Sequence, residues 1–364
     1  MPRKTMDLKF PSLGVVRRYG HRPDLTQSEF GTPWCTNVRL EDILTGRLRG
    51  GSFTGIAAGT KASPVYGDRA ITFSSNAILA SRKGVHTDLS LIADISDISR
   101  PIPFQLSESG EVGDTVVAVI PHKDVYLLCF TATTTWVMTG DPATGSLRNI
   151  SREVGIIGAS AWCVNHDTVY FLSSHGLYTI AANGSGLVAL SEDKIPEDLL
   201  DVVDTGCTLD YNHADRGVYV HLTGLETVSW LYDTERKGFW AFTTTTTASH
   251  VLLGPFHLGR LDAKGRVLNL HGTIAAGSDD VTWRIVTGDT AEDAADKGRA
   301  AIEESLVGQD ISAYVASEGT WTSGRNHMAY PRTPAMWCCL WLYSVGTWAY
   351  EEVLLTATLS GEWR

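Results

Sequence analysis

The chain has 364 residues, 43% of them hydrophobic, six cysteines and a net charge of −11 at pH 7. This length and composition favour a folded protein with a large core and argue against a disordered one. The cysteines are scattered through apolar stretches without regular spacing, which argues against a disulfide framework and favours reduced, buried thiols.

The first 60 residues differ in charge from the rest of the chain. They hold nine Lys and Arg against five Asp and Glu, whereas the remainder holds 21 against 36. We therefore expect a basic N-terminal arm, or docking segment, over residues 1–60 and an acidic body over residues 61–364. An acidic body disfavours tight binding to a phosphate backbone. Removal of the arm is expected to spare the fold and abolish docking on a partner.

The chain shows no targeting or membrane segment. The first residues lead through Leu8 and Phe10 into further charge, without the apolar region of a signal peptide. No stretch approaches the roughly 18 apolar residues of a membrane span. We expect a protein that is made and used in a cytoplasm, without membrane insertion.

A pattern recurs in the middle of the chain, where a polar turn is followed by a strand that begins with valine. The copies begin at Val125, Val169, Val218 and Val267, with steps of 44, 49 and 49 residues. Each of the first three also has a strand before the turn and another about ten residues after it. The preceding strands are expected at Val116–Ile120, Ala161–Val164 and Thr208–Tyr211, and the following ones at Trp136–Met138, Leu177–Thr179 and Trp230–Tyr232.

This arrangement is an antiparallel meander that repeats every 40 to 50 residues or so, which is typical of propeller blades. A β-sandwich also has many short strands, but it is not expected to repeat a whole meander at near-constant spacing. We therefore predict an all-β fold: a β-propeller of about five or six blades with an N-terminal extended arm and little helix.

Segments on either side of the repeats can supply the remaining blades. Ala70–Phe73 and Ala77–Ala80 can form one upstream, while Tyr314-Val315, Cys339–Tyr343 and Val353–Leu359 can complete the ring downstream. A helical insertion is expected at about residues 290–306, a stretch rich in Ala, Glu and Asp with Thr290 as the N-cap.

Nucleophile and metal signatures are weak in this sequence. Ser160 lies in Gly158-Ala159-Ser160-Ala161-Trp162, with tryptophan where a Gly-x-Ser-x-Gly elbow has its second glycine. His166 and His175 flank a turn, but no Cys or carboxylate stands at ligand spacing. Cys338 and Cys339 lie among apolar residues and are interpreted as core thiols. We expect Ser160 to begin a strand and the histidines to lie in surface turns.

Glycosidase chemistry needs two convergent carboxylates, which in a propeller can be far apart in sequence. Glu153, Asp167, Asp215 and Asp233 are candidates in that sense, although all four also suit turn capping and salt bridging. We predict no catalytic residue, no metal site and no cofactor.

Three groups of segments carry a family resemblance. They are Asn37-Val38-Arg39 with Asp42, Thr45–Gly51 and Gly55; Thr135–Pro142 with Asn149–Ile156, Ala161–Cys163, Tyr170–Leu172 and Gly176–Tyr178; and Gly319–Arg325 with Pro331-Arg332 and Trp348–Glu351. These segments resemble the tail nozzle (tail tubular or head-completion) proteins of short-tailed bacteriophages. The chain is short for such proteins.

The resemblance implies a structural virion protein, assembled in the host cytoplasm and located in the tail. Such subunits form a propeller-based ring, typically a homohexamer, that docks on the adaptor below the portal and continues the DNA-ejection channel. The implied partners are further copies of the chain, the portal adaptor, a tail fibre or tailspike protein, and genomic DNA that passes without specific binding.

The arm offers candidate docking residues. Arg39, Arg47 and Arg49 lie among four glycines, a pattern that predicts a loop presenting guanidinium groups to a partner's carboxylates. A solvated glycine–arginine turn is the alternative.

Two other functions stay open. A β-propeller glycoside hydrolase acting on host polysaccharide would need a funnel with convergent carboxylates. A cellular β-propeller interaction scaffold would be monomeric and indifferent to virion components. Our leading hypothesis is the non-enzymatic tail nozzle subunit.

Overall fold

The computed structural model describes residues 3–7, 34–36, 38–42, 47–50, 61 and 63–359, apart from 92–95, 108–112, 123–124, 167, 181–183, 185, 193, 196–198, 204–205, 224–228, 243–247, 259–263 and 327. Strands dominate these residues, which confirms a mostly β chain with little helix. Within this part of the chain, no helix combines the length and apolar character needed to cross a membrane.

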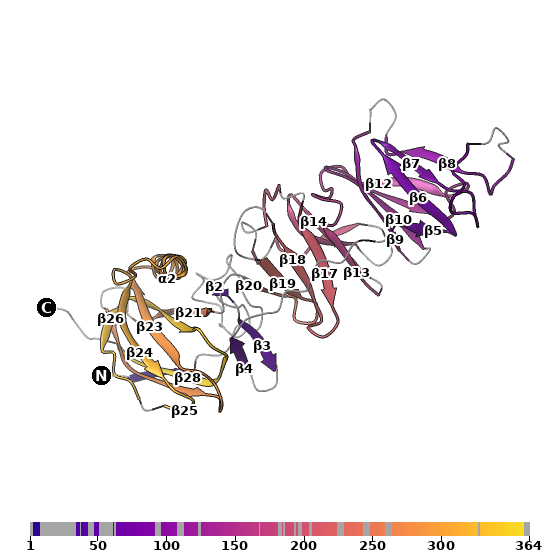
Figure 1. Cartoon of the computed structure of the whole chain (residues 1–364). Helices are drawn as coiled ribbons and strands as arrows, with labels where there is room; N and C mark the ends of the chain where they lie inside the picture. Colours follow the sequence, from indigo (N-terminus) through magenta and orange to yellow (C-terminus); the bar gives the residue numbers. More distant parts are fainter. Residues whose placement is uncertain are drawn as a thin grey trace. The chain divides into compact units, whose positions relative to one another are not determined.

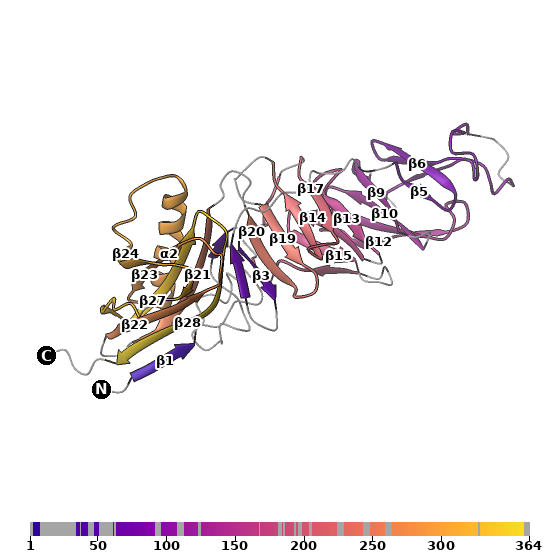
Figure 2. The same cartoon turned by 60° about the horizontal axis from the view of Figure 1, so that its bottom comes forward.

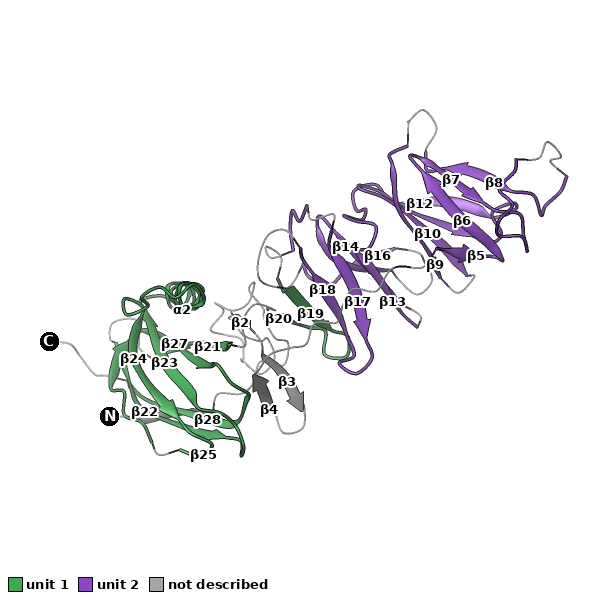
Figure 3. Cartoon of the chain, in the orientation of Figure 1, with its two compact units in different colours: residues 1–55, 193–195, 227–364 green, residues 56–192, 196–226 purple. Residues whose placement is uncertain are grey.

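The chain folds into two compact units (Figure 3). Unit 1 comprises residues 1–55, 193–195 and 227–364, and unit 2 comprises residues 56–192 and 196–226. This division differs from the expected arm and single body, because the N-terminal residues share a unit with the C-terminal third of the chain.

Unit 2 contains three four-stranded antiparallel sheets, each formed by consecutive strands, and the hairpin β17–β18 (Figure 1). The first sheet consists of β5 (Val65–Tyr66), β6 (Arg69–Ser74), β7 (Ala77–Ala80) and β8 (Ile102–Gln105). The second consists of β9 (Val116–His122), β10 (Tyr126–Thr131), β11 (Thr135–Thr139) and β12 (Ser146–Ser151). The third consists of β13 (Trp162–Asn165), β14 (Thr168–Ser173), β15 (Gly176–Ile180) and β16 (Leu187–Ala189), and the hairpin strands are β17 (Thr208–Asn212) and β18 (Gly217–His221).

The predicted repeat is confirmed for its first two copies as complete meanders. The strands expected at Val125 and Val169 are β10 and β14, each flanked by the expected preceding and following strands. The third copy supplies β17 and β18. The upstream meander is also confirmed, since β6 and β7 pair with each other.

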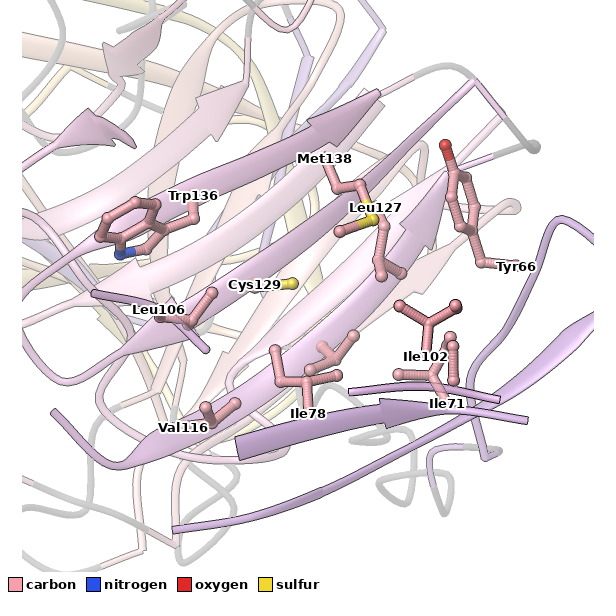
Figure 4. Close-up of a cluster of buried hydrophobic side chains, with 12 residues drawn as sticks. Tyr66, Ile71, Ile78, Ile102, Leu106, Val116, Leu127, Cys129, Trp136 and Met138 are labelled. Carbon is pink, nitrogen blue, oxygen red and sulfur yellow. The ribbon is translucent and has the colours of Figure 1, made fainter. Parts of the chain in front are cut away.

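Successive sheets of unit 2 pack face to face. One apolar cluster joins the first two sheets, with Ile71 and Ile78 on one side and Leu127 and Cys129 on the other (Figure 4). Side chains alternate between the faces of a strand. The next residue, Phe130, accordingly contacts Phe171 of β14, with ring centroids 4.8 Å apart. Every residue of β10 is therefore buried.

Unit 1 contains parts of two larger sheets. In one, the order is β25-β22-β28-β4-β3, with β1 also on β28 and β26 also on β22. Its strands are β1 (Arg3–Asp7), β3 (Val38–Asp42), β4 (Arg47–Gly50), β22 (Gly265–Ile274), β25 (Gly324–Arg325), β26 (Thr333–Ala335) and β28 (Trp348–Leu359). In the other, the order within unit 1 is β19-β20-β2-β21-β27-β23-β24. Its strands are β2 (Trp34–Thr36), β19 (Ser229–Asp233), β20 (Gly238–Phe242), β21 (Ser249–His257), β23 (Val281–Gly288), β24 (Val315–Trp321) and β27 (Trp337–Ser344).

The fourth copy of the repeat does not form a meander. The strand expected at Val267 exists as β22, but it pairs along its length with β28, about 90 residues later in the chain. The downstream segments expected to complete the ring also belong to unit 1, where β24 and β27 both pair with β23. A valine-led pattern identifies a strand but not its partner, which explains the error.

The N-terminal segment is not a free arm where the structure describes it. β1 pairs with Leu354–Thr358 of β28 and runs beside it (Figure 2), and β4 pairs with Trp348–Tyr350 of the same strand. β2 pairs with β20 and β21. These strands satisfy backbone groups of β28 and β21 that would otherwise be unpaired. Removing residues 1–60 is therefore expected to disrupt unit 1, contrary to the sequence-based expectation.

The helical insertion is confirmed as α2 (Ala291–Leu306), and the Thr290 hydroxyl caps it by accepting a hydrogen bond from the Asp293 N–H. The helix packs its small residues against β21 and β27. Ala294, Ala301 and Ile302 share an apolar cluster with Leu252 and Trp341. Acidic residues in its first turn, Glu292 and Asp293, favourably oppose the positive end of the helix dipole.

Candidate functional site

The three candidate docking arginines lie in a β-hairpin of unit 1. β3 and β4 pair antiparallel, so that Arg39 is opposite Arg49, and Arg47 is opposite Asp42. The expected glycine–arginine loop is therefore wrong at these three positions, where the backbone is extended and paired. The side chains of the three arginines lie outside the described part of the structure.

A charged and aromatic cluster in unit 2 was not expected from the sequence. The Lys61 ammonium donates to the Leu209 carbonyl oxygen at 2.6 Å and forms an ion pair with Asp210 at 3.3 Å. It also lies over the Trp162 ring, 5.2 Å from the centroid. The two charged side chains are largely shielded, with 19% and 16% of their surface exposed. The cluster thus connects the beginning of unit 2 with β13 and β17.

The electrostatics of this cluster favour a structural role. Burial raises the pKa of the neighbouring Cys163 thiol to about 12, with Lys61 opposing the rise and Asp210 adding to it. Burial also lowers the pKa of His221, with Asp210 opposing that shift. A nucleophilic cysteine requires a thiolate, and these shifts favour a neutral thiol and a neutral imidazole at pH 7. Lys61 and Cys163 are about 100 residues apart in the chain, so no local pattern could have revealed the cluster.

The two histidines considered as metal ligands are not brought together. His166 lies in the turn between β13 and β14, and His175 lies in the turn between β14 and β15. The six residues of β14 separate these turns by roughly 20 Å at 3.3 Å per residue. His166 instead lies near His213, with ring centroids 5.9 Å apart. Among the described residues, no group of three or more His, Cys, Asp or Glu side chains could hold a metal ion.

Two of the candidate glycosidase carboxylates are held within their own turns. Asp215 accepts hydrogen bonds from the Tyr219 hydroxyl at 2.8 Å and from the Asn212 amide at 2.5 Å. Asp233 accepts from the backbone N–H groups of Glu235 and Arg236 and pairs with the Arg236 guanidinium at 2.7 Å. The capping interpretation is confirmed for both residues.

The other two carboxylates give no further evidence of a catalytic pair. Glu153 is exposed in a turn after β12, where its N–H donates to the Ser151 hydroxyl. Asp167 lies outside the described residues.

The remaining nucleophile candidates are also parts of the framework. Ser160 lies just before β13, and its carbonyl accepts from the Leu209 N–H at 3.1 Å. Cys338 and Cys339 are buried in β27, as expected for core thiols. Burial raises the pKa of Cys338 to about 12 and that of Cys339 well above the usual value, so neither is activated for attack.

The chain matches no protein-family model, and no curated protein is significantly similar to it. Its function therefore has to be inferred from its own residues and their arrangement.

Proposed function

We propose that this protein is a non-enzymatic structural subunit of a phage tail nozzle. It forms a homo-oligomeric ring, a hexamer on the family resemblance, which docks on the adaptor below the portal and continues the DNA-ejection channel. On this proposal the three four-stranded sheets of unit 2 are blades of a β-propeller with about five or six blades.

The packing of unit 2 is the observation that carries the proposal. Its four-stranded meanders stack so that β10 is buried on both faces, between the first and third sheets. In propellers, each small sheet likewise buries its faces against its neighbours. Such a body is stabilised by contacts between whole sheets, which suits a load-bearing wall.

The distribution of charge supports passage of DNA without retention. Unit 2 has nine Lys and Arg against 19 Asp and Glu, whereas unit 1 has 21 against 22. Binding to DNA gains much of its free energy when basic side chains displace counterions from phosphates. A strongly acidic unit provides little of this attraction, so DNA can move past it.

The β3–β4 hairpin is the proposed contact with the adaptor. It places Arg39 opposite Arg49 on paired strands, with Arg47 nearby on β4. Guanidinium groups suit bidentate recognition of carboxylates. A paired hairpin would present them with less conformational freedom than a loop.

Electron microscopy of the purified full chain, alone and with the adaptor of the same virion, tests this function. We expect a hollow ring, either alone or on the adaptor. Substituting Gln for Arg39, Arg47 and Arg49 together should weaken adaptor binding, whereas Lys237→Gln on an exposed turn should leave it unchanged. A persistent monomer that binds no virion component would refute the proposal, and hydrolysis of host polysaccharide would favour the glycosidase alternative.

A further inference from the structure

The segment between β25 and β26 in unit 1 is held along β22 at three places. β25 pairs with Thr273 and Ile274, and β26 pairs with Gly265–Val267. Between these pairings, Ala329 and Leu270 exchange two backbone hydrogen bonds of 2.8 and 2.9 Å. The segment is thus ordered before any partner binds, which reduces the entropy lost on association.

A side chain fixes the start of this segment as well. The Asn326 amide oxygen accepts from the Thr322 N–H at 2.8 Å, and its nitrogen donates to the Thr322 carbonyl at 2.7 Å. The Asn326 N–H donates to the Gly272 carbonyl of β22. The loop therefore has a defined backbone path on both sides of the Ala329 contact.

Between its anchors, the segment exposes residues that are typical of protein interfaces. Tyr330 is 63% exposed and Met328 is 45% exposed, and the arginines at 325 and 332 are also exposed. Tyr, Met and Arg are enriched in interface centres. No Asp or Glu occurs from residue 319 to residue 350, and neither arginine has an ion-pair partner among the described residues. We call Arg325, Met328, Tyr330 and Arg332 the basic loop.

Unit 2 presents a short surface of complementary character. Leu199 and Val202 are buried, and the Asp201 N–H donates to the Ser174 carbonyl at 2.6 Å, so the backbone is anchored. The residues between and after these anchors project into solvent: Leu200 is 46% exposed, Val203 is 75% exposed, and Asp201 is exposed. We call Leu200, Asp201 and Val203 the acidic segment.

We infer that the basic loop of one copy binds the acidic segment of a second copy. Each surface combines two exposed apolar side chains with charge, and the charges are opposite in sign. A ring requires two different complementary surfaces on each chain, which one surface in each unit provides. The inference rests on the proposed ring and adds the contact that closes it.

Two variants that each damage one surface test this contact. The loop variant carries Tyr330→Ser and Arg332→Gln, and the segment variant carries Leu200→Ser and Val203→Ser. All four side chains are exposed, so both variants should unfold at the wild-type midpoint. A matched control carries Val307→Ser and Arg299→Gln, which lie outside both surfaces.

Mass photometry of the full chain, with the adaptor present where it is needed for assembly, measures the oligomers. Wild type and control should form the ring, and each damaged variant should self-associate at least about tenfold more weakly. An equimolar mixture of the two variants should form dimers, because one intact loop can still meet one intact segment, but it should not form rings.

The outcomes separate this contact from the proposed function. Rings formed by either damaged variant would overturn the contact and leave the nozzle proposal standing. A monomeric wild type, with and without adaptor, would overturn both. If the loop variant forms rings but loses affinity for single-stranded DNA, the loop is a nucleic-acid contact and the inference is wrong.

Discussion

The indole N–H of Trp348 donates a hydrogen bond to the Ser249 hydroxyl across 2.5 Å. Trp348 begins β28 and Ser249 begins β21, so this bond joins the two sheets of unit 1. The same hydroxyl donates onward to the Ser344 carbonyl at 3.2 Å. Both side chains are buried, and the bond therefore has no competition from solvent.

Ser249→Ala should destabilise unit 1 by about 1–3 kcal/mol, because it leaves the buried indole N–H without an acceptor. Urea unfolding followed by tryptophan fluorescence measures the change in midpoint. Val345→Ala, at a side chain that is 64% exposed, is the control and should shift the free energy of unfolding by no more than about 0.5 kcal/mol. Equal midpoints for the two variants would show that the bond contributes nothing to stability.

Arg69 holds the connection between β7 and β8 and is itself completely buried. Its guanidinium donates to the carbonyls of Ser81 and Arg100 at 2.7 Å and of Ile98 at 2.6 Å, and it pairs with Asp141 at 3.3 Å. A lysine ammonium cannot reproduce this planar fork of donors.

Arg69→Lys should therefore cost about 3–5 kcal/mol and make residues 82–100 susceptible to protease at neutral pH. Arg152→Lys, on the surface of the same unit, keeps the same change in chemistry and should have little effect. Mass spectrometry of the early cleavage products identifies the loop. Wild-type resistance in the Arg69 variant would mean that the guanidinium contacts do not order it.

The elements that could be predicted from the sequence are those set by local patterns. The meanders at Val125 and Val169 followed from alternation and turns, and α2 followed from composition and the Thr290 cap. Pairings between distant segments could not be predicted. β22 carries the same valine-led pattern as the blades, yet β28 determines its sheet.

The same limit applies to the candidate sites. The turn-capping roles of Asp215 and Asp233 are local and were expected. Lys61 meets Asp210 only through the folding of the whole unit, since the two residues are 149 positions apart. The docking role of Arg39, Arg47 and Arg49 stays a prediction.

The loop held by Arg69 should also loosen in acid. Asp88 and Asp97 both pair with the Arg82 guanidinium, at 2.8 and 3.0 Å. Hydrogen bonds from Ser90 and then from Arg82 lower the pKa of Asp88, and bonds from Ser99 and then Arg82 lower the pKa of Asp97. A lowered pKa means that these carboxylates stabilise the loop fully above their ordinary pKa and lose this effect as the pH falls through the folded-state value.

Pepsin cleavage within residues 82–100 should accordingly rise as the pH is lowered below about 4. Asp97→Asn should make the loop more susceptible to a neutral protease at pH 7 and reduce the dependence on pH. Asp114→Asn, outside the loop, is the control, because Asp114 has no contact with Arg82 among its described hydrogen bonds. A pH profile unchanged by Asp97→Asn would exclude this carboxylate as the cause.

Close contact between Gly272 and Trp321 provides a test of how the two sheets of unit 1 pack. A Cβ atom on Gly272 would lie 2.6 Å from the Trp321 ring, which is 2% exposed and cannot move freely. Gly272→Ala should therefore cost about 1–3 kcal/mol by overpacking. Near-UV circular dichroism should show a changed tryptophan environment, together with a lower urea midpoint. Gly186→Ala has nothing within 4 Å of the new Cβ and should be neutral or slightly stabilising. If both variants unfold like wild type, Trp321 does not pack against β22 in solution.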